Sequence, residues 1–120
     1  MSQSANVVSI HPYFKVHAGK MEAFKAALAP FIQKTATEPK NLYYDFTVNG
    51  DIVYCREAYV GAEGLLAHVA NVGPMLPTLF AMADLARIEV HGPAAEIEKL
   101  KGPLADLKPT WFTYFDGVKR

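Results

Sequence analysis

The sequence contains a single cysteine, and its charges cancel. Cys55 has no partner for an intramolecular disulfide, and its predicted strand setting favours a small buried hydrophobe over a nucleophile. Twelve basic and twelve acidic side chains leave no net positive field to attract nucleic acid or an anionic membrane. We therefore expect a protein of the reducing cytoplasm, with neither nucleic acid nor membrane as a partner.

Several motifs that mark well-known sites are also missing. No run of about 18 apolar residues could span a bilayer, and the N-terminal MSQSANVVSI has no basic start or long apolar stretch of a secretion signal. The chain has no glycine-rich nucleotide or phosphate loop, no Gly-x-Ser-x-Gly, and no pair of histidines or cysteines at metal-ligand spacing. We therefore expect no cofactor, no metal and no serine or cysteine nucleophile.

The composition is that of a globular protein. Of the 120 residues, 51% are hydrophobic and 20% are charged, which is too apolar for a disordered chain. A chain of this length can bury one core, and no repeat, low-complexity tract or linker divides it. We expect a single domain over residues 1–120.

Hydrophobic periodicity predicts alternating strands and helices. Apolar residues recur every second position in the predicted strands and at three- and four-residue steps in the predicted helices. The strands are expected at 7–16, 41–48, 51–59, 85–91 and 110–115, and the helices from 19 to about 35, at 62–72, at 75–84 and at 94–101.

Proline and glycine predict local features within this pattern. Pro12 cannot donate to a strand ladder, so the first strand should have an open edge or a bulge there. Pro30 should kink the first helix. The dipeptide Asn49-Gly50 between two alternating runs predicts a type I′ hairpin, because both residues tolerate positive φ, and hence an antiparallel pair.

The order of the elements predicts the fold class. Strand, helix, strand, strand, helix, strand is the split βαβ pattern of α+β ferredoxin-like folds, with an antiparallel sheet and helices on one face. The run TWFTYF at 110–115 carries aromatic residues on both faces of a predicted strand. Such a strand is unusual unless both faces are covered, so we expect a homodimer.

One short line of residues resembles a known family. Glu57 is followed two positions later by the aromatic Tyr59, and then by a predicted helix that carries Leu66 and His68. Together with Leu65, His68 gives this helix the motif Leu-x-x-His. This line is similar to the pattern of the antibiotic biosynthesis monooxygenase-like family of dimeric α/β-barrel proteins. The resemblance covers roughly residues 7–90.

The resemblance implies a barrel made by two subunits packed sheet against sheet, with a cavity between the sheet and the helices of each. It also implies that the strand at 110–115 can be exchanged with the partner subunit. The family includes cofactor-independent oxygenases of quinols and polyketide-like aromatics. Gly73-Pro74-Met75 stands where many members have a further histidine. The haem-degrading pattern is not matched either, because Pro12 and His68 occupy approximate places of its asparagine and tryptophan and no later haem-ligating histidine is present.

Proton transfer is the chemistry that these residues favour. A neutral imidazole can take a proton from an acidic phenol or enol, after which the substrate can react with oxygen. His68 is the candidate base, although a histidine at the margin of an apolar helix stripe can also be structural. The candidate substrate-binding residues are His11, Tyr13, Tyr44, Glu57, Tyr59 and Trp111.

We therefore predict a cofactor-independent monooxygenase that acts on a small aromatic, quinol or enolisable compound, with a histidine general base. Two alternatives remain open at this point. One is a non-catalytic dimer that binds a small apolar ligand, and the other is an interaction domain without a cavity. The sequence does not choose between an enzyme and a binder, and it does not identify the substrate.

Overall fold

The computed structural model describes residues 6–119, so the predicted polar lead at residues 1–5 lies outside the described residues. Five strands form one sheet in the order β2-β3-β1-β4-β5. The strands are β1 (Val7–Val16), β2 (Asn41–Asn49), β3 (Ile52–Val60), β4 (Ala83–Gly92) and β5 (Thr110–Thr113). The helices are α1 (Met21–Thr35), α2 (Gly61–Val72), η2 (Gly73–Met75), α3 (Leu76–Phe80), α4 (Ala94–Leu100) and η3 (Ala105–Leu107).

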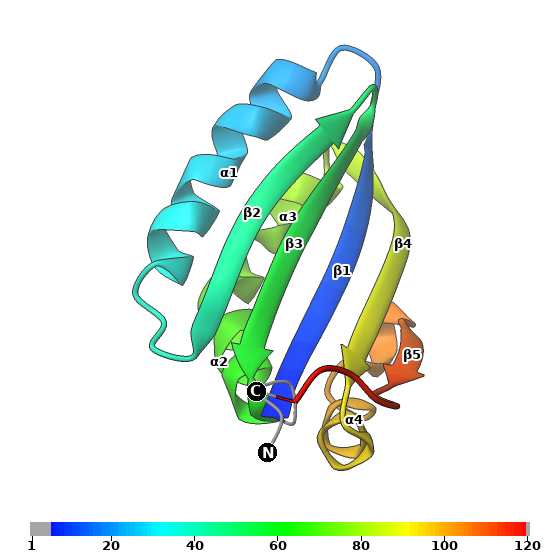
Figure 1. The fold of residues 1–120 in the computed structure, drawn as a ribbon. Coiled ribbons are helices and arrows are strands. Elements are labelled where there is room, and N and C mark those ends of the chain that lie inside the picture. The colour runs from blue at the N-terminus through cyan, green and yellow to red at the C-terminus, as the bar shows by residue number, and fades with distance from the viewer. Residues whose placement is uncertain (1–5, 120) are drawn as a thin grey trace.

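The topology is the ferredoxin-like arrangement, so the predicted α+β fold class is confirmed. Strands β2, β3, β1 and β4 pair antiparallel in that order, and β5 adds a short parallel strand to the free edge of β4. Helices α1, α2 and α3 lie behind the sheet in Figure 1, and no helix within residues 6–119 covers the face toward the viewer. We call this uncovered side the open face.

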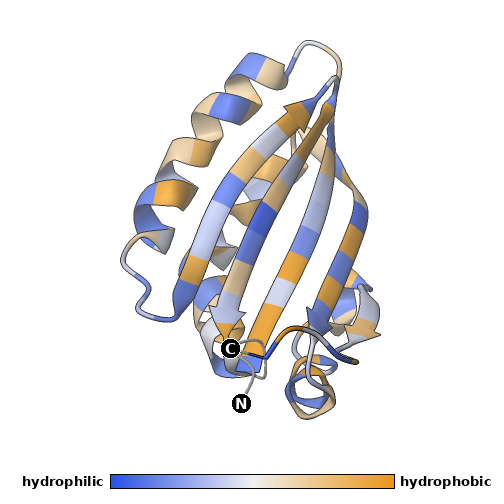
Figure 2. Cartoon of the chain, viewed as in Figure 1, coloured by the Kyte–Doolittle hydropathy of each residue, from blue (hydrophilic) through white to orange (hydrophobic). Residues whose placement is uncertain are grey.

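Strand alternation assigns each side chain to one of the two faces. In β1, Val8, Ile10, Pro12 and Phe14 are buried toward the helices, whereas Ser9, His11 and Tyr13 between them are only partly buried on the open face. Figure 2 shows this alternation as orange and blue bands along the strands. Because neighbouring side chains on a strand point to opposite faces, a change of one position moves a residue from one layer to the other.

The core between sheet and helices has two parts. One cluster gathers around Ile10, Tyr59 and Leu65, and includes residues of α4 and the segment after it. The other gathers around Phe14, Phe24 and Phe31, with Leu79 of α3 packed against them. The site described below lies where these two clusters meet.

The prediction of an open edge at Pro12 is wrong, and the bulge lies next to Pro12 and not at it, because Pro12 pairs in register with Ile88. β1 lies in the middle of the sheet, between β3 and β4. Its pairing with β4 shifts register between Tyr13 and Phe14, and its pairing with β3 runs to Ile10 and resumes at Tyr13. A bulge lets a central strand accommodate a residue without a backbone N–H.

The hairpin between β2 and β3 is confirmed, but its predicted turn type is wrong. Asn49 pairs with Ile52, so Gly50 and Asp51 form the two-residue turn. A type I′ turn requires positive φ at both central residues, and here only Gly50 has it, at +60°. Glycine at the first central position with positive φ is the pattern of a type II′ turn, which gives the same antiparallel pair.

Several helix and strand ends differ from the predicted ones. The predicted helix at 75–84 is replaced by η2 and the short α3, after which β4 begins at Ala83. Helix α1 continues through Pro30 to Thr35, held by buried Leu28 and Phe31 on either side of it. Within residues 6–119, no helix has the length and apolar character needed to cross a membrane.

Candidate active site

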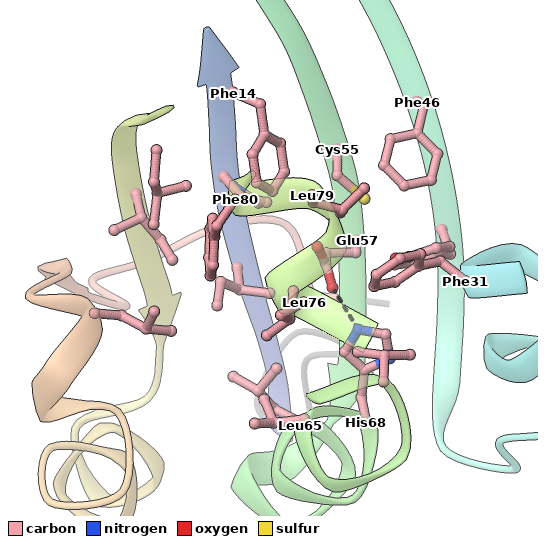
Figure 3. Close-up of a pocket in the computed structure, with 18 residues that line it drawn as sticks. Phe14, Phe31, Phe46, Cys55, Glu57, Leu65, His68, Leu76, Leu79 and Phe80 are labelled. Atoms are coloured by element: carbon pink, nitrogen blue, oxygen red, sulfur yellow. Dashed lines mark ion pairs between the residues drawn. The ribbon is translucent and has the colours of Figure 1, made fainter. Parts of the chain in front are cut away.

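A small cavity lies between the sheet and helices α1, α2 and α3. Its volume is about 80 Å³, and its walls are mainly aliphatic and aromatic side chains from both core clusters. Figure 3 shows Phe14, Leu76 and Phe80 around this cavity, with Glu57 and His68 directed toward one another within it. An apolar hollow with a few convergent polar groups is the usual form of a small-molecule site.

His68 reaches the cavity from α2 and is held by Glu38 from behind. The residue is 5% exposed, and its Nδ1 lies 3.1 and 3.0 Å from the two carboxylate oxygens of Glu38. Asn71 donates from Nδ2 to Glu38 at 2.8 Å and to the carbonyl of Lys34 at 3.0 Å, which fixes the carboxylate. A proton on Nδ1 therefore satisfies Glu38 and leaves Nε2 as the acceptor on the cavity side.

Glu57 reaches the same point from β3. Its Oε1 lies 3.4 Å from Nε2 of His68, an ion-pair contact marked by the dashed line in Figure 3. The hydroxyl of Tyr59 donates to the same oxygen at 2.5 Å. Tyr59 can do so because it is two residues further along β3, and residues two apart on a strand share a face. The imidazole is thus placed between two carboxyl groups, one at each ring nitrogen.

Burial shifts the protonation of both groups toward their neutral forms. Loss of solvent raises the pKa of Glu57 to about 7, although hydrogen bonds from Tyr59 and Cys55 to its carboxylate oppose the shift. Burial also lowers the pKa of His68 below its usual 6.5, against the opposing effect of the Glu38 charge. At neutral pH the imidazole is therefore free to accept a proton, beside a carboxyl group that holds one for part of the time.

The other ionisable side chains of the cavity stay protonated. Burial, followed by the nearby charge of Glu57, raises the pKa of the Tyr44 hydroxyl and of the Cys55 thiol far above neutrality. Neither group can therefore act as an anion near pH 7. Within residues 6–119, no three histidine, cysteine, aspartate or glutamate side chains are arranged to hold a metal ion. The chemistry of the site rests on Glu57 and His68.

The structure brings together four of the seven residues proposed from the sequence. Tyr44, Glu57 and His68 line the cavity, and the ring of Tyr44 lies 5.2 Å from that of His68. Tyr59 lies beneath them, where it contacts Glu57 and packs 4.9 Å from the imidazole. Trp111 is on β5 and packs against the cluster around Leu65, away from this point.

His11 and Tyr13 lie on the open face, so the structure does not bring them to the cavity. His11 contacts the hydroxyls of Tyr54 and Ser9 at 2.7 and 2.8 Å. Tyr13 stacks on Tyr54 at 4.7 Å between ring centres. His11 and Tyr13 are two and four positions from Ser9, so their side chains point to the same face of β1 as Ser9 and to the opposite face from Ile10. This alternation (the strand parity) places them on the other side of the sheet from His68.

Sequence reasoning missed Glu38, which lies in the loop between α1 and β2. Its one signal is its position, because it follows the C-terminus of α1 at Thr35 by three residues. A carboxylate there is repelled by the negative end of the helix dipole, so we expect another local contact to compensate for this repulsion. Its buried contact with His68 supplies that compensation.

Comparison with known proteins gives matches among solved structures. No family model matches the chain, and a search of curated proteins found no match. MupZ from Pseudomonas fluorescens is 43% identical, with 96% of this chain and 95% of that chain covered and a TM-score of 0.91. At this identity and coverage the likeness extends beyond the general fold.

More distant structures share the fold. SnoaB, a cofactor-independent oxygenase from Streptomyces nogalater, was solved as a mutant and is 18% identical, with a TM-score of 0.60 over 72% of this chain and 89% of its own. A protein described as an antibiotic biosynthesis monooxygenase is 17% identical, with a TM-score of 0.61 over 69% of this chain and 92% of its own. At such identities the similarity concerns the fold alone.

Proposed function

Since this chain belongs to the antibiotic biosynthesis monooxygenase-like family, we propose that it is a cofactor-independent monooxygenase acting on a small aromatic, quinol or enolisable compound. His68 is the general base of this proposal. The observation that carries it is the Nε2 atom of a buried imidazole, oriented by Glu38 and directed into an apolar cavity. The description of SnoaB as a cofactor-independent oxygenase supports the same reaction type.

The proposed reaction begins with proton removal. His68 takes a proton from a hydroxyl or an activated C–H group of the substrate, and Glu38 stabilises the imidazolium that forms. The substrate anion then transfers electrons to O₂, a C–O bond forms at its electron-rich carbon, and the peroxide anion takes the proton back from the imidazolium to give a hydroperoxide. For a methylene group, loss of water from the peroxide leaves a carbonyl, so that one oxygen atom enters the product and the other leaves as water. The substrate supplies all the electrons.

Oxygen uptake with a panel of anthrones and quinols tests this proposal. The wild type should consume one O₂ per molecule of anthrone oxidised. His68→Ala should lower kcat/KM by roughly 10²- to 10⁴-fold, which is the usual contribution of a general base. His17→Ala is the matched control, because His17 is exposed and pairs with Asp84 away from the cavity. Equal rates for the wild type and His68→Ala would remove His68 from the mechanism.

A non-catalytic ligand-binding protein is the second candidate, and the almost entirely apolar wall of the cavity favours it. A binder needs only this wall, whereas an enzyme also needs His68. Binding of an apolar fluorescent probe can therefore be compared between the wild type and His68→Ala. Equal binding by both proteins, together with no oxygen uptake by the wild type over the panel, would favour the binder.

We also propose that the functional unit is a homodimer, with two open faces packed together. This face carries stacked aromatic side chains, including Tyr13 and Tyr54, and Phe112 stacks on His91 at 4.5 Å. It also carries both signs of charge, since Arg87 pairs with Glu89 across the surface. A mixed aromatic and charged surface of this kind can complement a second copy of itself. Exchange of the segment at 110–115 between subunits stays a prediction, and in the single chain β5 pairs with its own β4.

A further inference from the structure

The cavity holds a second proton-transfer group that the base mechanism does not use. Glu57 is 5% exposed and lines the same hollow as His68. A structural carboxylate is normally paired with a cation, but Glu57 has as its partners the Tyr59 hydroxyl, the Cys55 thiol and an imidazole whose other nitrogen already contacts Glu38. Burial of a carboxyl group without a cationic partner is costly, and ionisable groups in such settings are concentrated at functional sites.

We propose that Glu57 is a catalytic acid paired with His68, and that the pair interconverts the keto and enol forms of a small ketone without oxygen. This inference rests on the site of the proposed function and narrows its substrate class to enolisable ketones. It also assigns an activity that should persist when oxygen is absent. The geometric basis is the contact of 3.4 Å between Oε1 and Nε2 at the cavity surface.

The proposed step uses both groups at once. His68 Nε2 takes a proton from the carbon next to the carbonyl, and the electrons of the broken C–H bond form a carbon–carbon double bond. The carbonyl electron pair moves to oxygen, which takes the proton from Glu57. The products are a neutral enol, an imidazolium at His68 and a carboxylate at Glu57. The carbon that loses the proton and the carbonyl oxygen of the ketone are separated by one carbon. A proton acceptor and a proton donor that lie side by side, as Nε2 of His68 and Oε1 of Glu57 do, can therefore reach both sites.

The contact between the two side chains also resets the site. After the step, the proton on His68 Nε2 lies beside the Glu57 carboxylate, and its transfer to Oε1 restores the starting pair. The hydroxyl of Tyr59 and the thiol of Cys55 hydrogen bond to the Glu57 carboxyl group, which stabilises its anion during the cycle. The carboxylate of Glu38 lies behind the ring, 3.0 Å from Nδ1, where it stabilises the imidazolium. The cycle thus needs no external acid, base or cofactor.

Hydrogen–deuterium exchange under argon tests the proposal. The probe is 2-indanone in D₂O, and loss of its ring CH₂ signal is followed by NMR with and without enzyme. The wild type should accelerate exchange over the buffer rate. Glu57→Gln and His68→Ala should each lower that acceleration by about 10²-fold or more, and the double variant should be little slower than either single variant because the two groups act as a unit.

Matched controls separate a chemical role from a structural one. Glu63→Gln removes an exposed carboxylate of α2 that pairs with Lys40, and it should exchange at the wild-type rate. Circular dichroism and thermal unfolding establish which variants are folded. If Glu57→Gln does not fold, Glu57→Asp keeps the acid but withdraws it from His68, and it should retain only part of the exchange. A folded Glu57→Gln that exchanges at the wild-type rate would overturn the role of Glu57.

The outcome also distinguishes this inference from the proposed function. Exchange under argon without oxygen uptake on anthrones would support the inference and overturn the monooxygenase. Oxygen uptake on anthrones without exchange of 2-indanone or 2-tetralone under argon would overturn the inference and leave the monooxygenase. Exchange and uptake that both depend on His68, with only exchange strongly reduced in Glu57→Gln, would support the two proposals together.

Discussion

Glu38 does not line the cavity but hydrogen bonds to His68, which does, and this defines Glu38 as a positioning residue. Its negative charge raises the pKa of His68 against the effect of burial. Replacing it in Glu38→Gln keeps the length of the side chain and removes the charge. The pKa of His68 should then fall further, because the imidazolium loses its partner.

The expected result is a change in the pH profile as well as in the rate. A general base works when it is unprotonated, so activity is lost as pH falls through the pKa of His68. In Glu38→Gln this acid limb of kcat/KM should move to lower pH, while the rate on the plateau falls by roughly 10- to 100-fold. Glu98→Gln, an exposed carboxylate of α4 paired with Lys101, should change neither quantity. An unchanged acid limb in Glu38→Gln would contradict the assignment.

At the scale of single residues, the sequence identified the groups but not their arrangement. Glu57 and His68 stood out because a charged residue near a strand end and a histidine at the margin of an apolar helix stripe are both unusual. Glu38 did not stand out, because it lies 30 residues from His68 along the chain and their contact leaves no local sequence pattern. Long-range contacts of this kind depend on how α1 and α2 pack, which periodicity does not encode.

Helix α2 carries His68, and its distance from the sheet is set by Gly64. A Cβ atom at Gly64 would lie 3.0 Å from Cβ of Lys40 and 3.1 Å from Cβ of Tyr59. Gly64→Ala should therefore push α2 away from β3 and separate His68 from Glu57. We expect a net loss of about 1 to 3 kcal/mol in the free energy of unfolding, as for overpacked sites, together with a lower turnover rate.

Gly73 provides the control for this prediction, because it lies at the other end of α2. Apart from its chain neighbours, no atom lies within 4 Å of a Cβ built there. Because Gly73 has helical φ and ψ of −49° and −43° and precedes Pro74, a Cβ there crowds the proline ring, and this offsets the gain of about 0.4 to 1 kcal/mol through the unfolded state. Gly73→Ala should therefore change the free energy of unfolding by less than about 1 kcal/mol and leave turnover unchanged. Urea unfolding of both variants measures the difference. A Gly64→Ala protein as stable and active as the wild type would show that α2 is not held at this contact.

At the scale of elements, the local sequence predicted which strands pair more accurately than it predicted where helices and strands end. The hairpin followed from Asn49-Gly50, yet strand β2 used Asn49 for pairing and moved the turn by one residue. The end of α3 at Phe80 was not predicted, because the apolar pattern continues to Ala83 and only the start of β4 stops the helix. Pairing of β4 with the central strand β1 outweighs the helical propensity of the residues that follow Phe80.

At the scale of the molecule, the fold sorts the histidines into two layers. The order of the elements was enough to predict the ferredoxin-like sheet, but not which strand face borders the cavity. His11 seemed able to line the same cavity as His68 because it lies beside Tyr13 on the polar face of the first strand, and only the strand parity places the two histidines on opposite sides of the sheet. The same parity leaves the open face for a partner.

The homodimer predicted from the sequence can be tested on this open face. Tyr13 lies in central strand β1, stacks on Tyr54 and has the guanidinium of Arg87 5.9 Å from its ring centre. Tyr13→Asp should leave the single chain folded, because Arg87 can pair with the new carboxylate. Between two packed faces, however, a pair of buried carboxylates would lose solvent and repel each other.

Light scattering after size exclusion provides the measurement. The wild type at micromolar concentration should have twice the mass of the chain, and Tyr13→Asp should raise the dimer dissociation constant at least tenfold, or about 1.4 kcal/mol. Ile32→Asp is the control: it replaces an apolar side chain that is 47% exposed on α1, in the helical layer, and should leave the mass unchanged. A monomeric wild type would refute the dimer. A dimer disrupted by Ile32→Asp but not by Tyr13→Asp would place the interface on the helices, and the open face would then need another explanation for its stacked aromatic side chains.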